Sequence, residues 1–184
     1  GISNITLYAF STENWSRPVF EIKALMKLFH YYLKKKLTML YEENVKVVII
    51  GDINPFPKVI KDYIKNLEKL TKNNDGMFLN LAMNYGGRSE IVRATKGIAK
   101  AVSDGLLKIE DLDEDLFSQY LYTDGQKDPD LIIRTAGEKR LSNFLLWQSA
   151  YSELYFVEKN WPDFNKFDLI EALDHYKSRK RKYG

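Results

Sequence analysis

Short apolar strands that alternate with amphipathic helices constrain the fold of this chain more than any other feature. The strand-like runs are Asn4–Phe10, Val45–Ile50, Met77–Met83, Leu131–Arg134 and Glu153–Val157. Strands separated by whole helices form right-handed crossovers within a parallel sheet. The sequence therefore predicts an α/β fold with a single parallel β-sheet flanked by helices, and such sheets bind ligands at the carboxyl ends of their strands.

Helix boundaries follow from local signals. Pro18 opens a first helix to about Glu43, and Pro55 or Pro57 opens a second to about Leu70. The remaining predicted helices follow the turn at residues 84–88, the acidic segment 111–115, and Phe167, from which the last helix runs to Arg181. The apolar face of the first helix contains Leu25, Leu28, Leu33 and Leu40, and in most proteins such a face is core. The segment 143–150 fits neither helix nor strand clearly.

Composition limits the classes of protein to which the chain can belong. Its 184 residues, 45% of them hydrophobic, suit one domain. The balance of 28 Lys and Arg against 25 Asp and Glu gives a net charge of only +3, which argues against a nucleic-acid partner. The absence of cysteine fits a reducing compartment, so a cytoplasmic location is expected. The apolar runs are too short to cross a bilayer, although contact with a membrane surface stays open.

Polar loops follow three of the predicted strands. They are Ser11–Arg17, Asn84–Arg88 and Arg134–Ser142. In the third loop Arg134 and Arg140 stand six residues apart, so that two guanidinium groups can reach one diphosphate from different sides. The sequence therefore predicts that the loops converge on one site for a phosphorylated small molecule.

Several blocks in this order resemble the cis-prenyltransferases, most closely the bacterial undecaprenyl diphosphate synthases. The blocks are Ala9–Pro18, Asn80–Arg88, Asp130–Arg134, Glu153–Phe156 and Trp161–Phe164. The resemblance implies repeated condensation of isopentenyl diphosphate onto an allylic diphosphate, usually farnesyl diphosphate, with Mg²⁺ as cofactor. The product implied is a long-chain cis-polyprenyl diphosphate such as undecaprenyl diphosphate, the precursor of the lipid carrier for cell-wall synthesis.

The resemblance also implies roles for individual residues. Isopentenyl diphosphate would bind to Arg134, Arg140, Leu141 and Ser142, and Glu153 would serve the metal. Substrate contacts near the reacting carbons would come from Ser11, Thr12, Glu13, Trp15 and Arg17. Asn14 matches a residue described as a proton acceptor. A neutral amide is a poor base, so orienting a water or a diphosphate oxygen is the more plausible catalytic role for Asn14.

The chain departs from the family pattern at three places. The family's aspartate-bearing motif D-G-N-G-R-W is not found in residues 1–184, so a single domain without its first strand, inactive as given, is expected. Lys139 and Lys182 stand where relatives have other residues, and both keep or add positive charge. The alternative hypothesis is a non-catalytic prenyltransferase-like subunit, or an inactive fragment, that binds a partner or a lipid diphosphate.

The resemblance further implies partners. A homodimer is expected, and the aromatic-rich segment 147–156 is the candidate contact, because aromatic side chains often anchor interfaces. Release of a lipid product implies peripheral contact of a cytoplasmic enzyme with a membrane surface.

Overall fold

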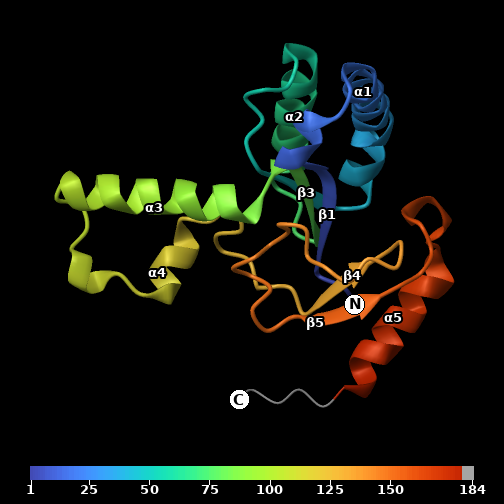
Figure 1. Cartoon of the computed structure of the whole chain (residues 1–184). Helices are drawn as coiled ribbons and strands as arrows, with labels where there is room; N and C mark the ends of the chain where they lie inside the picture. Colours follow the sequence, from blue (N-terminus) through green and yellow to red (C-terminus); the bar gives the residue numbers. More distant parts are fainter. Residues whose placement is uncertain (180–184) are drawn as a thin grey trace. The chain divides into compact units, whose positions relative to one another are not determined.

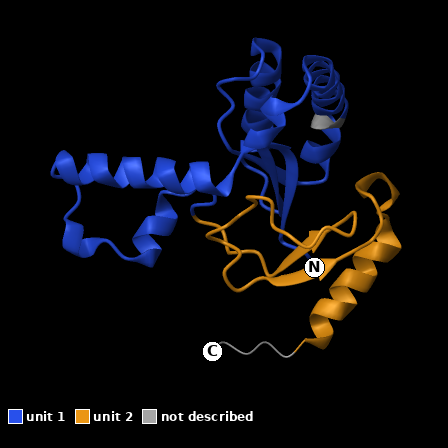
Figure 2. Ribbon diagram, viewed as in Figure 1, with its two compact units in different colours: residues 1–124 blue, residues 125–184 orange. Residues whose placement is uncertain are grey.

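The computed structural model describes residues 1–179, except for the side chains of residues 36 and 37. The chain divides into two compact units, Gly1–Asp124 and Gly125–Gly184 (Figure 2). Each unit is built around parallel strands, and each is described by itself below.

The first unit contains three strands and their covering helices (Figure 1). Its strands are β1 (Asn4–Ser11), β2 (Val45–Ile50) and β3 (Met77–Tyr85). Its helices are α1 (Val19–Glu42), α2 (Lys58–Thr71), α3 (Gly87–Ser103) and α4 (Glu114–Gln119), and short 3-10 turns span Thr12–Ser16 and Ile109–Asp111. The strand β3 lies between β1 and β2 and is parallel to both.

The core of the first unit lies between the sheet and the helix pair α1 and α2. Its buried members are Phe10, Leu33, Val45, Val47, Phe56, Ile60, Ile64, Leu67 and Met83. Register places Val45 beside Met77 and Val47 beside Leu79, so alternate residues of the two strands face the helices. A shift of register around Ala9 then allows Phe10 to pair with Met83 and to enter the same core.

Buried polar side chains join the helices to strand β2. Thr71, which is fully buried at the end of α2, accepts a hydrogen bond from the Val47 N–H at 3.1 Å. Asn74 donates to the Val45 carbonyl at 2.8 Å. These bonds satisfy backbone groups of β2 that would otherwise be buried without a partner.

The second unit pairs β4 (Leu131–Arg134) with β5 (Glu153–Phe156) in parallel and adds α5 (Lys166–Ser178). A 3-10 turn spans Trp161–Asp163. Hydrogen bonding continues past the strands, because the Ala136 N–H donates to the Lys159 carbonyl at 2.8 Å. Asn165 caps α5 through its side chain, which accepts from the Phe167 N–H at 2.8 Å.

The α/β class, with parallel strands and flanking helices, is confirmed. Pairing among the described strands forms two sheets, one in each unit, where the sequence predicted one. That residues 1–184 form a single domain without the first strand of the family stays a prediction. The predicted elements recur with small shifts in their ends, and segment 143–150 forms turns. The predicted end of the last helix at Arg181 lies outside the described residues.

One of the four leucines of the predicted apolar face of α1 is exposed. Leu25, Leu33 and Leu40 pack against the core, whereas Leu28 is 48% exposed. At 100° a residue, Leu28 falls on the side of the helix opposite Leu33, so that burying one exposes the other. Among the described residues, no helix is long and apolar enough to cross a membrane.

The loop after β2 depends on Gly51. Its φ is +120°, and an added Cβ would lie 2.1 Å from the carbonyl oxygen of Met83. The backbone of β3 therefore approaches Gly51 more closely than any side chain permits.

We expect Gly51→Ala to lower the free energy of unfolding by at least about 2 kcal/mol, since backbone strain and a clash with main-chain atoms act together. Gly105→Ala is the matched control, because Gly105 has a φ of +71° and nothing within 4 Å of an added Cβ. Conformational strain alone predicts about 1 kcal/mol there. Equal losses in urea denaturation would show that the contact with Met83 contributes nothing.

Candidate functional site

The loop after β1 is folded by Ser11 and Asn14. They form a capping box, in which the Ser11 backbone N–H donates to Asn14 Oδ1 at 2.9 Å. The amide oxygen of Asn14 therefore holds the loop in shape. What Asn14 retains for a ligand is its amide NH₂, which is a donor and fits an orienting role better than that of a base.

Trp15 ties this loop to the end of β3. Its indole Nε1 donates to Asn84 Oδ1 at 2.8 Å, and Asn84 Nδ2 in turn donates to the Asp52 carbonyl at 2.7 Å. Asn84 is buried and has a φ of +49°. One amide side chain thus joins the carboxyl ends of β1, β2 and β3, which confirms that the first two predicted loops converge.

Trp15 also belongs to an aromatic cluster. Its ring centroid lies 5.0 Å from that of Phe10 and 5.6 Å from that of Phe56. Phe29 of α1 contacts both phenylalanines, at 6.0 and 6.4 Å. These contacts fix the indole on two sides, so Trp15 is partly a core residue as well as a candidate substrate contact.

The other predicted residues of this loop are more open. Thr12 is half-buried, Glu13 and Arg17 are exposed, and the Glu13 carbonyl accepts from Ser16 Oγ at 2.7 Å. Arg17 lies 3.9 Å from Glu21 on the first turn of α1. An exposed pair at this distance contributes at most about 1 kcal/mol, so a ligand could recruit the Arg17 guanidinium at small cost.

Glu90, which no sequence motif singles out, supports the turn into α3. This carboxylate is 1% exposed and accepts hydrogen bonds from the Tyr85 hydroxyl and, at 2.7 Å, from the Tyr122 backbone N–H. Burial raises the pKa of the Tyr122 phenol, and Arg93, whose guanidinium lies 3.9 Å from that ring centroid, acts in the opposite direction. Glu90 thereby holds the Gly86–Gly87 turn against the segment after α4.

In the second unit, the loop after β4 brings Arg134 and Ser142 together. Arg134 Nη2 donates to Ser142 Oγ at 3.4 Å, a long hydrogen bond, while the buried Arg134 Nε has no hydrogen-bond partner. Arg140 pairs with Glu138, and Leu141 between Arg140 and Ser142 is half-buried. Ala136, Gly137, Ser142 and Asn143 all have positive φ, so the loop is tightly coiled.

Glu153 lies at the start of β5, whereas Arg134 and the loop that carries Arg140 lie at and beyond the end of the neighbouring strand β4. It stands beside Leu131 at the start of β5, whereas Arg134 stands beside Phe156 at the end. Glu153 Oε2 lies 3.6 Å from Arg179 Nε, so the predicted metal ligand is ion-paired. Lys139 is exposed, and Lys182 lies outside the described residues.

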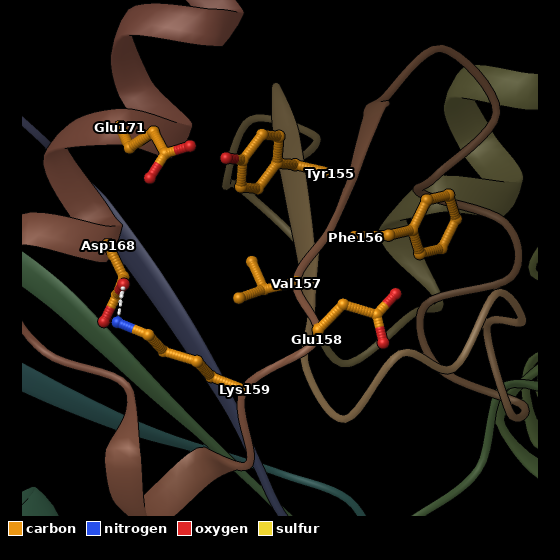
Figure 3. Close-up of a pocket in the computed structure, with 7 residues that line it drawn as sticks. All are labelled: Tyr155, Phe156, Val157, Glu158, Lys159, Asp168 and Glu171. Atoms are coloured by element: carbon orange, nitrogen blue, oxygen red, sulfur yellow. Dashed lines mark hydrogen bonds and ion pairs between the residues drawn. The ribbon is translucent and has the colours of Figure 1, made fainter.

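A hollow of about 320 Å³ lies between β5 and α5 and does not include the predicted site residues (Figure 3). It is lined by Tyr155, Phe156, Val157, Glu158, Lys159, Asp168 and Glu171. Lys159 Nζ donates to Asp168 Oδ1 at 2.5 Å, and this bond, together with the Asn165 N–H, lowers the pKa of Asp168. The Lys159–Asp168 pair ties the end of β5 to the first turn of α5.

The described residues include one candidate carboxylate for a metal, Glu153, but no preformed cluster of metal-binding side chains. Within residues 1–179, no group of three or more His, Cys, Asp or Glu side chains could hold a metal ion. Mg²⁺ commonly takes one or two carboxylates and completes its octahedron with phosphate oxygens and water, so a single glutamate is compatible with it. Convergence of the Arg134–Ser142 loop with the loops of the first unit stays a prediction.

Comparison with known proteins identifies the family. The family model described as putative undecaprenyl diphosphate synthase matches residues 1–184. An isoprenyl transferase from Clostridium perfringens is 51% identical over 184 residues, which are 100% of this chain and 73% of that protein. A ditrans,polycis-undecaprenyl-diphosphate synthase from Buchnera aphidicola, named as (2E,6E)-farnesyl-diphosphate specific, is 51% identical over 183 residues, 100% of this chain and 74% of that protein.

Solved structures agree. The lavandulyl diphosphate synthase from Lavandula x intermedia, in complex with dimethylallyl diphosphate, has a TM-score of 0.96 and 40% identity, covering 99% of this chain and 79% of that one. A probable undecaprenyl diphosphate synthase from Campylobacter jejuni has a TM-score of 0.86 and 37% identity, covering 98% and 82%. With about half of its residues shared with isoprenyl transferases along its whole length, this chain belongs to the undecaprenyl diphosphate synthase family of prenyltransferases.

Proposed function

We propose that this chain condenses isopentenyl diphosphate repeatedly onto farnesyl diphosphate and so makes a long-chain cis-polyprenyl diphosphate such as undecaprenyl diphosphate. The observation that carries the proposal is its 51% identity, over 183 residues, to the farnesyl-diphosphate-specific synthase of Buchnera aphidicola. In each cycle a carbon–carbon bond forms at the allylic carbon, diphosphate leaves that carbon, and the isopentenyl unit loses a proton.

The arginine loop is the proposed site for isopentenyl diphosphate. Arg134 already points to Ser142, and the buried Nε of Arg134 lacks a partner. An unsatisfied buried donor costs about 1–3 kcal/mol, and a diphosphate oxygen would remove that cost. Arg140 is exposed and pairs with Glu138, so it can turn to the same diphosphate, with Leu141 beside the isopentenyl group.

The Ser11–Arg17 loop is the proposed site for the reacting carbons. Asn14 orients a water or a diphosphate oxygen through its NH₂ group, because its oxygen holds the Ser11 N–H. Trp15 offers a fixed apolar ring to the prenyl chain. The same loop contains Ser11, Thr12 and Glu13, which are further candidate contacts for substrate. Arg17 would add positive charge where the diphosphate departs.

Prenyltransferases generally use Mg²⁺, and Glu153 is the carboxylate that we propose for it. When bound, the ion would offset negative charge on the departing diphosphate. To bind the ion, Glu153 would first give up its ion pair with Arg179. Breaking this pair costs little free energy, because the Arg179 side chain is 53% exposed.

We also propose a homodimer and a cytoplasmic location with contact at a membrane surface. The 147–156 segment supports the dimer, since Tyr151, Leu154 and Phe156 are large apolar residues that are 73%, 40% and 37% exposed.

A chimera tests the proposed function. The isoprenyl transferase of Bacillus subtilis is 52% identical over 184 residues, which make up 71% of its length. Replacing that part with this chain should give butanol-extractable polyprenyl product from farnesyl diphosphate, labelled isopentenyl diphosphate and Mg²⁺. A folded chimera without activity would instead favour the non-catalytic hypothesis.

Removing either loop arginine should weaken substrate binding far more than folding. In the chimera, Arg134→Ala or Arg140→Ala is expected to cost about 1.5–3 kcal/mol of isopentenyl diphosphate binding, since a charge-assisted contact is lost. Lys127→Ala, at an exposed site in the same unit, is the control. If the Michaelis constant for isopentenyl diphosphate is unchanged in both arginine variants, the assignment of the loop is wrong.

A further inference from the structure

The outward face of α1 carries large apolar side chains that are exposed. Phe20, Leu28, Tyr31 and Met39 are 72%, 48%, 54% and 43% exposed. At 3.6 residues a turn these four positions fall within an arc of about 100°, on the side away from the buried Leu33. We call these four residues the outer stripe.

Lysines border the outer stripe. Lys23, Lys27 and Lys34 are exposed and, spaced four and seven residues apart, follow one edge of it. Lys35 lies within it and donates to the Tyr31 hydroxyl at 3.1 Å. The two glutamates of α1 stand at its ends, and Glu21 is paired with Arg17. The outer stripe and the lysines that border it therefore present apolar and positively charged groups.

From this pattern we infer that α1 docks on an anionic lipid surface, with the outer stripe in the headgroup boundary and the lysines on lipid phosphates. A helix with an apolar stripe, aromatic residues and bordering lysines is the composition that binds in the interface plane of a bilayer. A second copy of this chain fits less well, because a two-fold contact through α1 would bring the same lysines together.

The inference deepens the proposed function, since it names the surface that would meet the membrane receiving the product. Figure 1 shows α1 beside α2, and only the inner side of α1 is used by the core. Substrate is not needed for the contact. Vesicle binding without substrate therefore tests the inference separately from catalysis.

The test is co-sedimentation of the purified chain with vesicles of phosphatidylcholine, with and without phosphatidylglycerol. Binding is expected only with phosphatidylglycerol and should fall as salt rises. Changing Lys23, Lys27 and Lys34 together to Gln should weaken binding by roughly a hundredfold, about fivefold for each lysine. The matched control changes the exposed Lys96, Lys108 and Lys127 to Gln and should bind as the wild type does.

A second pair of variants tests the apolar part. Phe20→Ser with Leu28→Ser should weaken binding at least about tenfold, whereas Leu106→Ser with Ile109→Ser, at sites 81% and 59% exposed, should not. Unchanged circular dichroism and thermal unfolding verify the fold of each variant. Equal binding by stripe and control variants would overturn the inference. The inference would also be overturned if the stripe variants still bound vesicles but lost self-association in analytical ultracentrifugation.

Discussion

The first unit depends on a hydrogen-bonded amide, the side chain of Asn84. It accepts from the Trp15 indole at 2.8 Å and donates to the Asp52 carbonyl at 2.7 Å, so it needs both an acceptor and a donor. The backbone carbonyl of Asn84 also accepts a hydrogen bond from the Asp52 N–H at 3.4 Å. An aspartate would lack the donor and a leucine would lack both groups. The placement of Trp15, and with it the link between the β1 loop and the ends of β2 and β3, depends on this one buried residue.

Much of the fold could be predicted because its signals are local. Pro18 and Pro57 directly precede α1 and α2, and Asp113 caps α4 by accepting from the Leu116 N–H at 2.8 Å. Leu28 was placed on one apolar face with Leu25, Leu33 and Leu40 because helical spacing alone tolerates neighbouring positions. Its exposure became visible only when the direction of the sheet was known. That error and the outer stripe of α1 have the same origin, since the helix is apolar on two sides.

The candidate site was predictable in its residue types and less so in its contacts. The sequence indicates that two arginines follow β4, but not that Arg140 pairs with Glu138 or that Glu153 pairs with Arg179. Asn84 and Glu90 form bonds to residues 32 or more positions away, and no local pattern signals them. Glu90 reads as an ordinary acid in the first turn of a helix, where a carboxylate is favourable in any case.

The central claim is that the loop after β4 binds the diphosphate of isopentenyl diphosphate. A crystal structure of the protein soaked with isopentenyl diphosphate tests it most directly. We predict that the diphosphate lies between the guanidinium groups of Arg134 and Arg140, accepts a hydrogen bond from the now unpartnered Arg134 Nε, and contacts Ser142. Diphosphate bound elsewhere, with Arg140 still paired to Glu138, would contradict the account.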